Sequence, residues 1–168
     1  MRTTRRYVPI ALLVFIVYIV FSGSVSPYDI AIGVALAIAV SALTTRFLVS
    51  DGGKAMSFRR FANLVKYALY YLTVAEFKAH SLVIRIILSR GMPVRPAIVR
   101  VPYRARNPYT IVGSANSITN TPGTVVVDLD TGRSLFYVHW IYVIGLDPET
   151  TYREILKDFE EGLSKVFE

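Results

Sequence analysis

The sequence predicts an α-helical membrane hairpin plus an interfacial amphipathic helix, followed by a small α+β domain of order β-α-β-β-α. Hydrophobic residues make up 53% of the 168 residues, which is high for a soluble domain of this length. Long apolar runs occupy the first half, whereas alternating patterns and turn residues occupy the second. We expect the hairpin in residues 1–50, a loop and the amphipathic helix in 51–91, and the α+β domain in 92–168.

Two apolar runs lie near the N-terminus. The first has its core at Tyr7–Phe21, and the second extends from Ile30 to Val49 with a single charge, Arg46, near its end. Each has roughly the ~20 residues that a helix needs to cross a ~30 Å hydrocarbon core. Ser, Gly, Pro and Asp residues between the runs predict a tight turn, and therefore a helical hairpin. A cleaved signal peptide is the alternative for the first run, because a basic N-terminus precedes it.

The basic residues are unevenly distributed. Residues 1–106 contain 15 Lys and Arg with 3 Asp and Glu, whereas residues 107–168 contain 4 and 9. Basic residues, including Arg2 and Lys54, lie at both ends of the hairpin. The turn between the two apolar runs contains only one charged residue, Asp29. The positive-inside rule therefore places the N-terminus, Gly52–Arg60 and everything after Arg90 in the cytoplasm of a multi-pass protein of the cell membrane. Because the basic half is also the apolar half, we expect the lipid bilayer and no nucleic acid as a partner.

The third apolar stretch, Phe61–Leu88, is interrupted by charges. On an α-helix Lys66, Glu76 and His80 would lie on one side. The apolar stripe would contain Phe61, Leu64, Val65, Ala68, Tyr71, Leu72, Ala75, Ala79, Leu82, Val83 and Ile86. This pattern predicts an amphipathic helix along the cytoplasmic interface or against partner helices. A third span is the alternative, although each charge near the bilayer centre would cost ~2.5–3.5 kcal/mol.

The C-terminal segment has the patterns of a small antiparallel sheet with two helices. Ala97–Val101 alternates as a strand does, and Val112–Asn120 is small and polar, typical of a short helix or a loop. Two further strands are expected at Thr124–Leu129 and Leu135–Ile141, joined by a tight turn at Asp130–Gly132. Asp147 and Pro148 open the last helix. Its buried stripe is expected to contain Tyr152, Ile155, Phe159, Leu163 and Val166.

No residue is predicted to be catalytic, cofactor-binding or metal-ligating. The sequence has no cysteine, and its two histidines, His80 and His139, do not have a metal-ligand spacing. Strand alternation puts His139 on the same face as Tyr137, and a structural role is expected for it, so we expect no enzyme activity and no cofactor. Glu76, Lys78 and His80 form a possible polar site, with a solvated helix face as the alternative.

Small residues recur on the second apolar run. Gly33, Ala37 and Ser41 are four residues apart, a spacing that lets helices approach closely. They are candidate assembly residues, and packing against the first run within the hairpin is the alternative. The segment Thr121-Pro122-Gly123-Thr124 is expected to be a structural turn in which Gly123 needs a positive φ.

Three segments of the chain resemble a known family. They are Ile98-Val-Arg-Val-Pro102, Ser114-Ala-Asn-Ser-Ile-Thr-Asn-Thr-Pro-Gly-Thr-Val-Val-Val-Asp128 and Leu135-Phe-Tyr-Val-His-Trp140. Together with the order of hairpin, interrupted helix and α+β domain, they resemble the E subunit of multisubunit Na⁺/H⁺ antiporters of the Mrp/Mnh type. Asn120 stands where the family pattern suggests a hydrophobic residue. Related modules occur in archaeal membrane-bound hydrogenases and sulfur-reducing complexes.

The resemblance implies a non-catalytic structural or assembly subunit of a multisubunit monovalent cation/proton antiporter module, alone or within an archaeal respiratory complex. Its partners would be the other subunits, and the family assigns transport to larger ones. One alternative is a stand-alone membrane-anchored domain that recruits anionic lipid or a protein partner through the basic residues Arg90–Arg106. Another is a membrane enzyme with His139 as its base.

Overall fold

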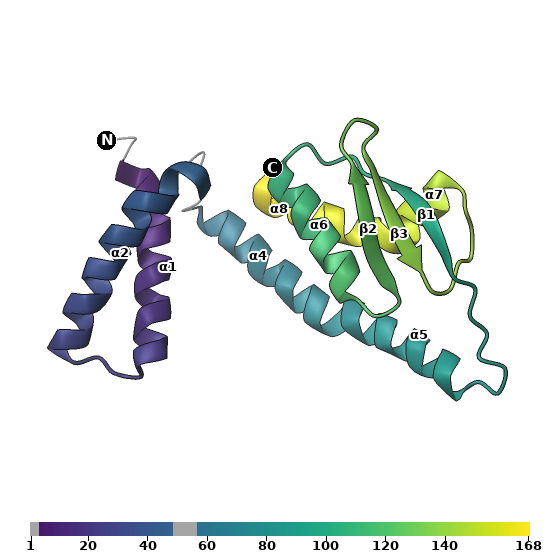
Figure 1. Ribbon diagram of the computed structural model, residues 1–168, viewed down its shortest axis with the longest axis horizontal. Coiled ribbons are helices and arrows are strands. Elements are labelled where there is room, and N and C mark those ends of the chain that lie inside the picture. The colour runs from purple at the N-terminus through teal and green to yellow at the C-terminus, as the bar shows by residue number, and fades with distance from the viewer. Residues whose placement is uncertain (1–3, 49–56) are drawn as a thin grey trace. The chain divides into compact units, whose positions relative to one another are not determined.

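The computed structural model describes residues 4–48 and 57–168 (Figure 1). Arg2, Lys54 and most of the predicted loop at 51–60 therefore lie outside the described residues. The chain divides into two compact units, residues 1–60 and 61–168, which are considered separately. The predicted amphipathic helix belongs to the same unit as the α+β domain.

The first unit contains a helical hairpin, formed by α1 (Thr4–Ser22) and α2 (Pro27–Leu48). Ser24 Oγ and Ser26 Oγ each donate a hydrogen bond of 2.6 Å to the Asp29 carboxylate, and Asp29 N donates to Ser26 Oγ at 3.2 Å. This reciprocal pattern caps the first turn of α2, so the helix begins at Pro27, three residues before the predicted apolar run. By length and composition Pro27–Phe47 is long and apolar enough to cross a membrane, and Arg6–Ser22 is a shorter apolar helix.

A long helix begins at the boundary between the two units. It consists of α4 (Phe58–Tyr70), one π-helical turn η1 (Tyr71–Ala75) and α5 (Glu76–Leu88). A π turn contains about one residue more than an α turn. It therefore rotates every later side chain by about 100° relative to an uninterrupted α-helix. The prediction of one continuous α-helical stripe over Phe61–Ile86 is wrong for this reason.

The π turn divides the predicted stripe between two sides of the helix. Ala75 and Ile86 are buried, and Tyr71 and Val83 are half-buried. Phe61 and Leu72, from the same predicted stripe, are 62% and 67% exposed. The buried side carries Asn63, Tyr67, Tyr70, Tyr71, Ala75, Ala79, Val83 and Ile86, and it faces the α+β domain. The opposite side is exposed and largely apolar.

The α+β domain has the expected β-α-β-β-α order. Its elements are β1 (Ala97–Pro102), α6 (Pro108–Asn120), β2 (Thr124–Asp130), β3 (Leu135–Trp140), α7 (Pro148–Thr151), the π turn η2 (Tyr152–Leu156) and α8 (Lys157–Phe167). The three strands form an antiparallel sheet of order β1-β3-β2. In Figure 1, α6, η2 and α8 lie on the same side of this sheet, and α4–α5 runs along the domain next to α6.

The core lies between the sheet and these helices. Phe136, Val138 and Trp140 alternate along β3 toward the helices and are at most 7% exposed. The core also contains Val99, Val101, Tyr103, Ile118, Tyr152, Ile155, Leu156 and Phe159, with Ala75 from the long helix. Because Ala75 belongs to the same cluster as the strands, the long helix is an integral layer of the domain. The opposite face of the sheet is open, with Ile98 and Val125 62% and 44% exposed.

Two boundaries differ from the sequence prediction. α6 begins at Pro108, four residues earlier than expected, because Asn107 caps it by accepting a hydrogen bond from Tyr109 N at 2.9 Å. The turn between β2 and β3 extends to Ser134, which has a φ of +56°. Asp130 Oδ1 accepts a hydrogen bond from Arg133 N at 2.9 Å and stabilises this longer turn. Both segments depend on side-chain oxygens that bind nearby backbone N–H groups.

Candidate functional site

The candidate assembly residues of α2 lie on its buried side. A Cβ on Gly33 would lie 3.0 Å from Tyr18 Cδ1 and 3.1 Å from Phe15 Cδ2, so α1 approaches the glycine closely. Ala37 and Ser41, on the same stripe, are 5% and 4% exposed. This stripe therefore packs inside the hairpin. A second row of small residues, formed by Ala31, Ala35 and Ala39, is exposed on another side of α2.

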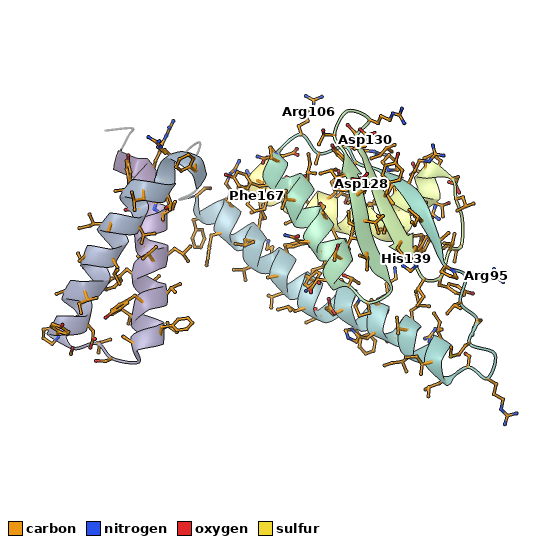
Figure 2. The ribbon with its side chains drawn as sticks, in the orientation of Figure 1. Arg95, Arg106, Asp128, Asp130, His139 and Phe167 are labelled. Carbon is orange, nitrogen blue, oxygen red and sulfur yellow. The ribbon has the colours of Figure 1, made fainter. Side chains whose placement is uncertain are left out.

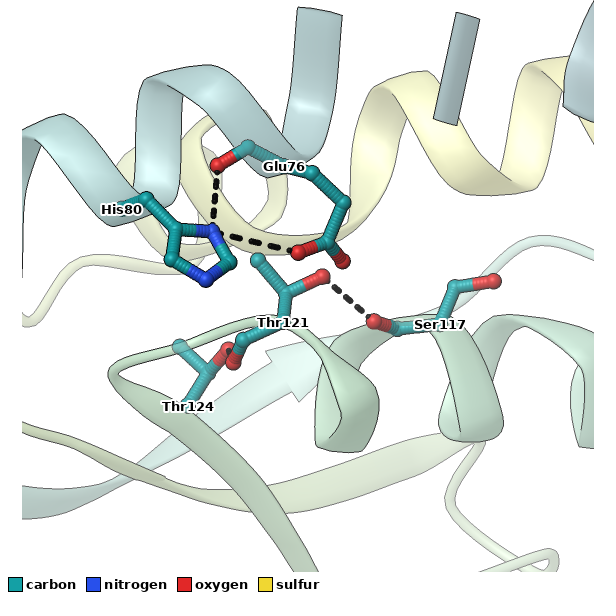
Figure 3. Close-up of polar contacts among 5 residues, drawn as sticks. All are labelled: Glu76, His80, Ser117, Thr121 and Thr124. Carbon is teal, nitrogen blue, oxygen red and sulfur yellow. Dashed lines mark hydrogen bonds and ion pairs between the residues drawn. The ribbon is translucent and has the colours of Figure 1, made fainter. Parts of the chain in front are cut away.

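The Thr-Pro-Gly-Thr segment connects α6 to β2. Gly123 has a φ of +97°, and Thr124 N donates to Thr121 O at 3.4 Å, which is the geometry of a type II turn. Thr121 Oγ1 donates to Ser117 O at 2.6 Å (Figure 3). Thr124 Oγ1 donates to Ile118 O at 2.8 Å. These bonds satisfy carbonyl groups at the end of α6 that have no partner within the helix.

The turn also contacts α5. A Cβ on Gly123 would lie 3.1 Å from Ile141 Cγ2 and 3.7 Å from Val83 Cγ2. Gly123 O accepts a hydrogen bond of 2.9 Å from Ile141 N, so the turn is fixed to the residue that follows β3. The motif that carries the family resemblance therefore holds α6, the sheet and α5 together.

The predicted polar site is only partly assembled. His80 Nδ1 lies 2.8 Å from Glu76 O and 3.3 Å from Glu76 Oε2, and Figure 3 shows both residues beside Thr121. The Glu76 side chain is 20% exposed, and its Oε1 is buried without a hydrogen-bond partner. The structure therefore brings Glu76 and His80 together at the edge of the domain. Lys78 lies on the exposed side of α5.

Tyr71, the first residue of the π turn, lies beside Glu76 and packs against the core of the domain. Its ring packs against Phe159, with the centroids 6.0 Å apart. Burial and the neighbouring Glu76 carboxylate raise the pKa of the Tyr71 hydroxyl, so it stays protonated near neutral pH. The geometry is that of a contact between the helix and the domain.

A second polar cluster was not predicted from the sequence. Glu160 on α8 is 4% exposed. Its Oε1 accepts hydrogen bonds from Arg104 N at 2.7 Å and Ala105 N at 2.8 Å, and Tyr152 Oη donates to its Oε2 at 3.0 Å. Burial and the Glu160 carboxylate raise the pKa of Tyr152 to about 12, and the Arg104 guanidinium lies 4.2 Å from the ring centroid. Glu160 thus fixes the loop after β1 to the last helix, which explains why a charged residue is buried.

The contacts of α4 with α6 and α8 were also missed. Tyr67 Oη and Ser117 Oγ are 2.5 Å apart, and Tyr70 Oη donates to Asp158 Oδ2 at 2.6 Å. Asn63 Nδ2 donates to Lys165 O at 2.9 Å. Burial raises the pKa of Tyr67 and Tyr70, so both phenols remain donors. Tyr67 and Tyr70, which lie outside the predicted apolar stripe, were the available signal, because a tyrosine buried in protein normally finds a polar partner.

His139 and the basic residues are dispersed. His139 is exposed on the open face of the sheet, opposite Ile98 on one neighbouring strand and Val125 on the other (Figure 2). Arg95 lies over the Tyr142 ring at 5.9 Å, and Arg106 points outward at the far end of the domain (Figure 2). Within residues 4–48 and 57–168, no three His, Asp or Glu side chains are grouped so as to hold a metal ion.

Comparisons with known proteins agree with this arrangement. A family model described as Na⁺/H⁺ ion antiporter subunit matches residues 11–166. The chain is 28% identical to the E subunit of the Na⁺/H⁺ antiporter of Alkalihalophilus pseudofirmus over 156 residues, which are 92% of this chain and 94% of that protein. It is also 28% identical to the E subunit of the Na⁺/H⁺ antiporter of Bacillus subtilis over 99 residues, or 58% of this chain and 61% of that protein.

One solved structure is similar over almost the whole chain. It is a chain of the membrane-bound sulfane sulfur reductase, an archaeal respiratory membrane complex, with 25% sequence identity and a TM-score of 0.82. The similarity covers 96% of this chain and 99% of that one. The residues matched by the family model, 11–166, include most of α1, all of α2 and the long helix, and nearly all of the α+β domain. The chain therefore belongs to the Na⁺/H⁺ ion antiporter subunit family, in which it is of the E type.

Proposed function

We propose that this chain is a non-catalytic accessory subunit that anchors and assembles an antiporter-type module in the membrane. The observation that carries the proposal is the family match over residues 11–166, which covers most of the hairpin and nearly all of the α+β domain. Its partners are the other subunits of such a complex. The hydrogen bonds of Glu160 and Tyr67 support a structural role, since they join α8 to the loop after β1 and α4 to α6.

In the proposed topology, α1 and α2 both cross the bilayer and the C-terminal domain is cytoplasmic. The distribution of Lys and Arg supports this placement, because the turn at residues 23–26 has no basic residue and both ends of the hairpin do. The small-residue stripe of α2 supports a tightly packed hairpin. The exposed row at Ala31, Ala35 and Ala39 is then available to a neighbouring subunit.

The long helix α4–α5 is proposed to lie along the cytoplasmic interface, and its contacts with the domain argue against a third span. Tyr67, Tyr70 and Asn63 are hydrogen-bonded to α6 and α8. A helix that crossed the bilayer would either lose these bonds or carry polar groups of α6 and α8 into hydrocarbon. Backbone and side-chain polar groups left without partners in lipid cost several kcal/mol each.

The proposal is tested first by native purification of the full-length chain. We expect a heteromeric membrane complex, and deletion of this subunit should reduce the amount of intact complex. Recovery of the chain as a monomer or homodimer would instead favour a stand-alone membrane-anchored domain. The topology is tested with Ser134→Cys, since the chain contains no other cysteine. A thiol reagent that does not cross membranes should label this variant from the cytoplasmic side, and labelling only from outside would refute the topology.

A Glu76→Gln variant separates an assembly role from participation in ion transfer. The substitution preserves the size of the side chain and removes its charge. Because His80 and Tyr71 already place the carboxylate at a contact between helix and domain, transport per assembled complex should change little. Loss of transport in a fully assembled complex would contradict the non-catalytic role. Glu149→Gln removes a carboxylate that is 73% exposed in the same domain and serves as the matched control.

A further inference from the structure

The outer side of the long helix carries an apolar stripe that nothing in the domain covers. Its members are Phe61, Val65, Leu69, Leu72, Phe77, Ile84 and Leu88, with exposed fractions between 41% and 79%. Consecutive members are three or four residues apart up to Leu72, and Leu72 and Phe77 are five apart. The last two spacings are seven and four residues, which again fit an α-helix. Figure 2 shows side chains projecting from the outer side of this helix.

The five-residue step coincides with the π turn at Tyr71–Ala75. In an uninterrupted α-helix, Phe77, Ile84 and Leu88 would be rotated by about 100° from their observed positions, to the side of the helix opposite Phe61 and Leu72. Ala79, Val83 and Ile86 would take their places. The π turn therefore aligns the two halves of the exposed stripe, and the same rotation turns Val83 and Ile86 toward the domain. One extra residue thus produces two continuous faces on a helix of about 45 Å.

Cations line one edge of this stripe. Lys66, Lys78 and Arg85 are exposed. When the extra residue of the π turn is taken into account, they lie on the same side of the helix, within the about 100° that separates consecutive residues around its axis. Lys66 also lines a hollow of about 290 Å³ shared with Asp158 and Glu161, so part of its charge is offset within the domain. Lys78 and Arg85 lie on α5, beyond this hollow.

The sequence provides no negative charge on this surface. Glu76 is the one acidic residue between Phe61 and Leu88, and its carboxylate lies against the domain beside His80. We propose that the stripe is a docking surface for a bilayer containing anionic phospholipid, with Lys78 and Arg85 at the headgroups and the aligned apolar side chains in the acyl boundary. The inference deepens the proposed interfacial placement of this helix and rests on the cytoplasmic position of the domain.

Charge and shape distinguish this occupant from a protein partner. A helix with Phe and Leu on one face and Lys or Arg along its edge is the pattern of helices that lie in the membrane interface. Each cation near an anionic membrane surface strengthens association about fivefold. The attraction depends on ionic strength, because the headgroup field decays within about 10 Å at 0.1 M salt.

The test uses the full-length chain in nanodiscs of neutral phosphatidylcholine, with and without phosphatidylglycerol. A Leu72→Cys variant carries an environment-sensitive dye, and quenching by spin-labelled lipid measures docking of the stripe. We expect strong quenching in the anionic nanodiscs, and a reduction of about 25-fold in the docking equilibrium for Lys78→Gln combined with Arg85→Gln. One molar salt should have a similar effect.

The matched control is Arg133→Gln combined with Arg153→Gln, which removes the same charge from exposed positions of the domain and should leave quenching unchanged. Equal quenching in both lipids, or no effect of the Lys78 and Arg85 changes, would overturn the anionic-lipid inference. Absence of quenching in the anionic nanodiscs, or protection of the dye in the assembled complex, would also overturn it. The Ser134→Cys labelling result judges the proposed topology independently of these outcomes.

Discussion

Gly162 on α8 lies at the closest approach between the long helix and the domain. A Cβ at this position would be 2.5 Å from Tyr67 Cδ2 and 3.0 Å from Tyr67 Cε2. The ring has little room to move away, because its hydroxyl is hydrogen-bonded to Ser117 on α6. Gly162→Ala should therefore cost about 1–3 kcal/mol of stability through overpacking. The higher helix propensity of alanine returns about 1 kcal/mol, so we expect a net loss of up to about 2 kcal/mol.

The sign of this effect depends on Tyr67. In a Tyr67→Ala background the ring is absent, and Gly162→Ala should then stabilise the protein by roughly the propensity difference of 1 kcal/mol. A double-mutant cycle isolates this reversal as a coupling energy. The chain has a single tryptophan, and Trp140 is 7% exposed in the core of the domain. Its fluorescence during urea unfolding of the detergent-solubilised full-length protein therefore reports on this domain.

Gly113→Ala is the matched control, since Gly113 lies in the interior of α6 in the same domain. A Cβ there would contact Leu163 Cδ1 at 3.1 Å, the end of a flexible side chain. The change should be close to neutral or slightly stabilising. If Gly162→Ala behaved like Gly113→Ala in the wild-type background, the tight contact between α4 and α8 would not exist as described.

Three further substitutions test other contacts. Ala37→Leu should separate α1 from α2 and reduce the amount of assembled complex recovered from membranes, whereas Ile38→Leu, at a position 64% exposed, should not. Gly123→Val should lower domain stability by about 1–3 kcal/mol, because its φ of +97° is strained for a β-branched residue, and unchanged urea unfolding would contradict this. Glu160→Gln should cost about 1–2 kcal/mol in the same assay, since hydrogen bonds to a charged acceptor are stronger than those to an amide, and an unchanged midpoint would show that the charge is unimportant.

Local patterns in the sequence were sufficient for most of the secondary structure. Strands alternate with period two and carry β-branched residues, so β1, β2 and β3 were found close to their observed ends. Asp147 and Pro148 marked the start of the last helix because capping is a local interaction, and Asp147 Oδ1 accepts from Thr150 N at 2.8 Å. The positive φ of Gly123 followed from its place after Pro122 for the same reason.

Other features were decided by contacts between residues distant in the sequence. Glu160 resembles an ordinary surface residue of an amphipathic helix until the backbone N–H groups of Arg104 and Ala105, more than 50 positions away, are placed beside it. The side of α2 that packs in the hairpin was likewise ambiguous, because two rows of small residues have equal spacing.

The π turn is the clearest case of a tertiary decision. By itself, the sequence Phe61–Leu88 determines an amphipathic helix, and a uniform α-helical period places Val83 and Ile86 on the same stripe as Phe61. A π turn is intrinsically less favourable than an α turn and forms where tertiary packing compensates for it. Here it lets Ala75 join the domain core and turns Phe77 outward. The sequence thus determined which elements form, and packing of the helix against the domain decided which face remains exposed.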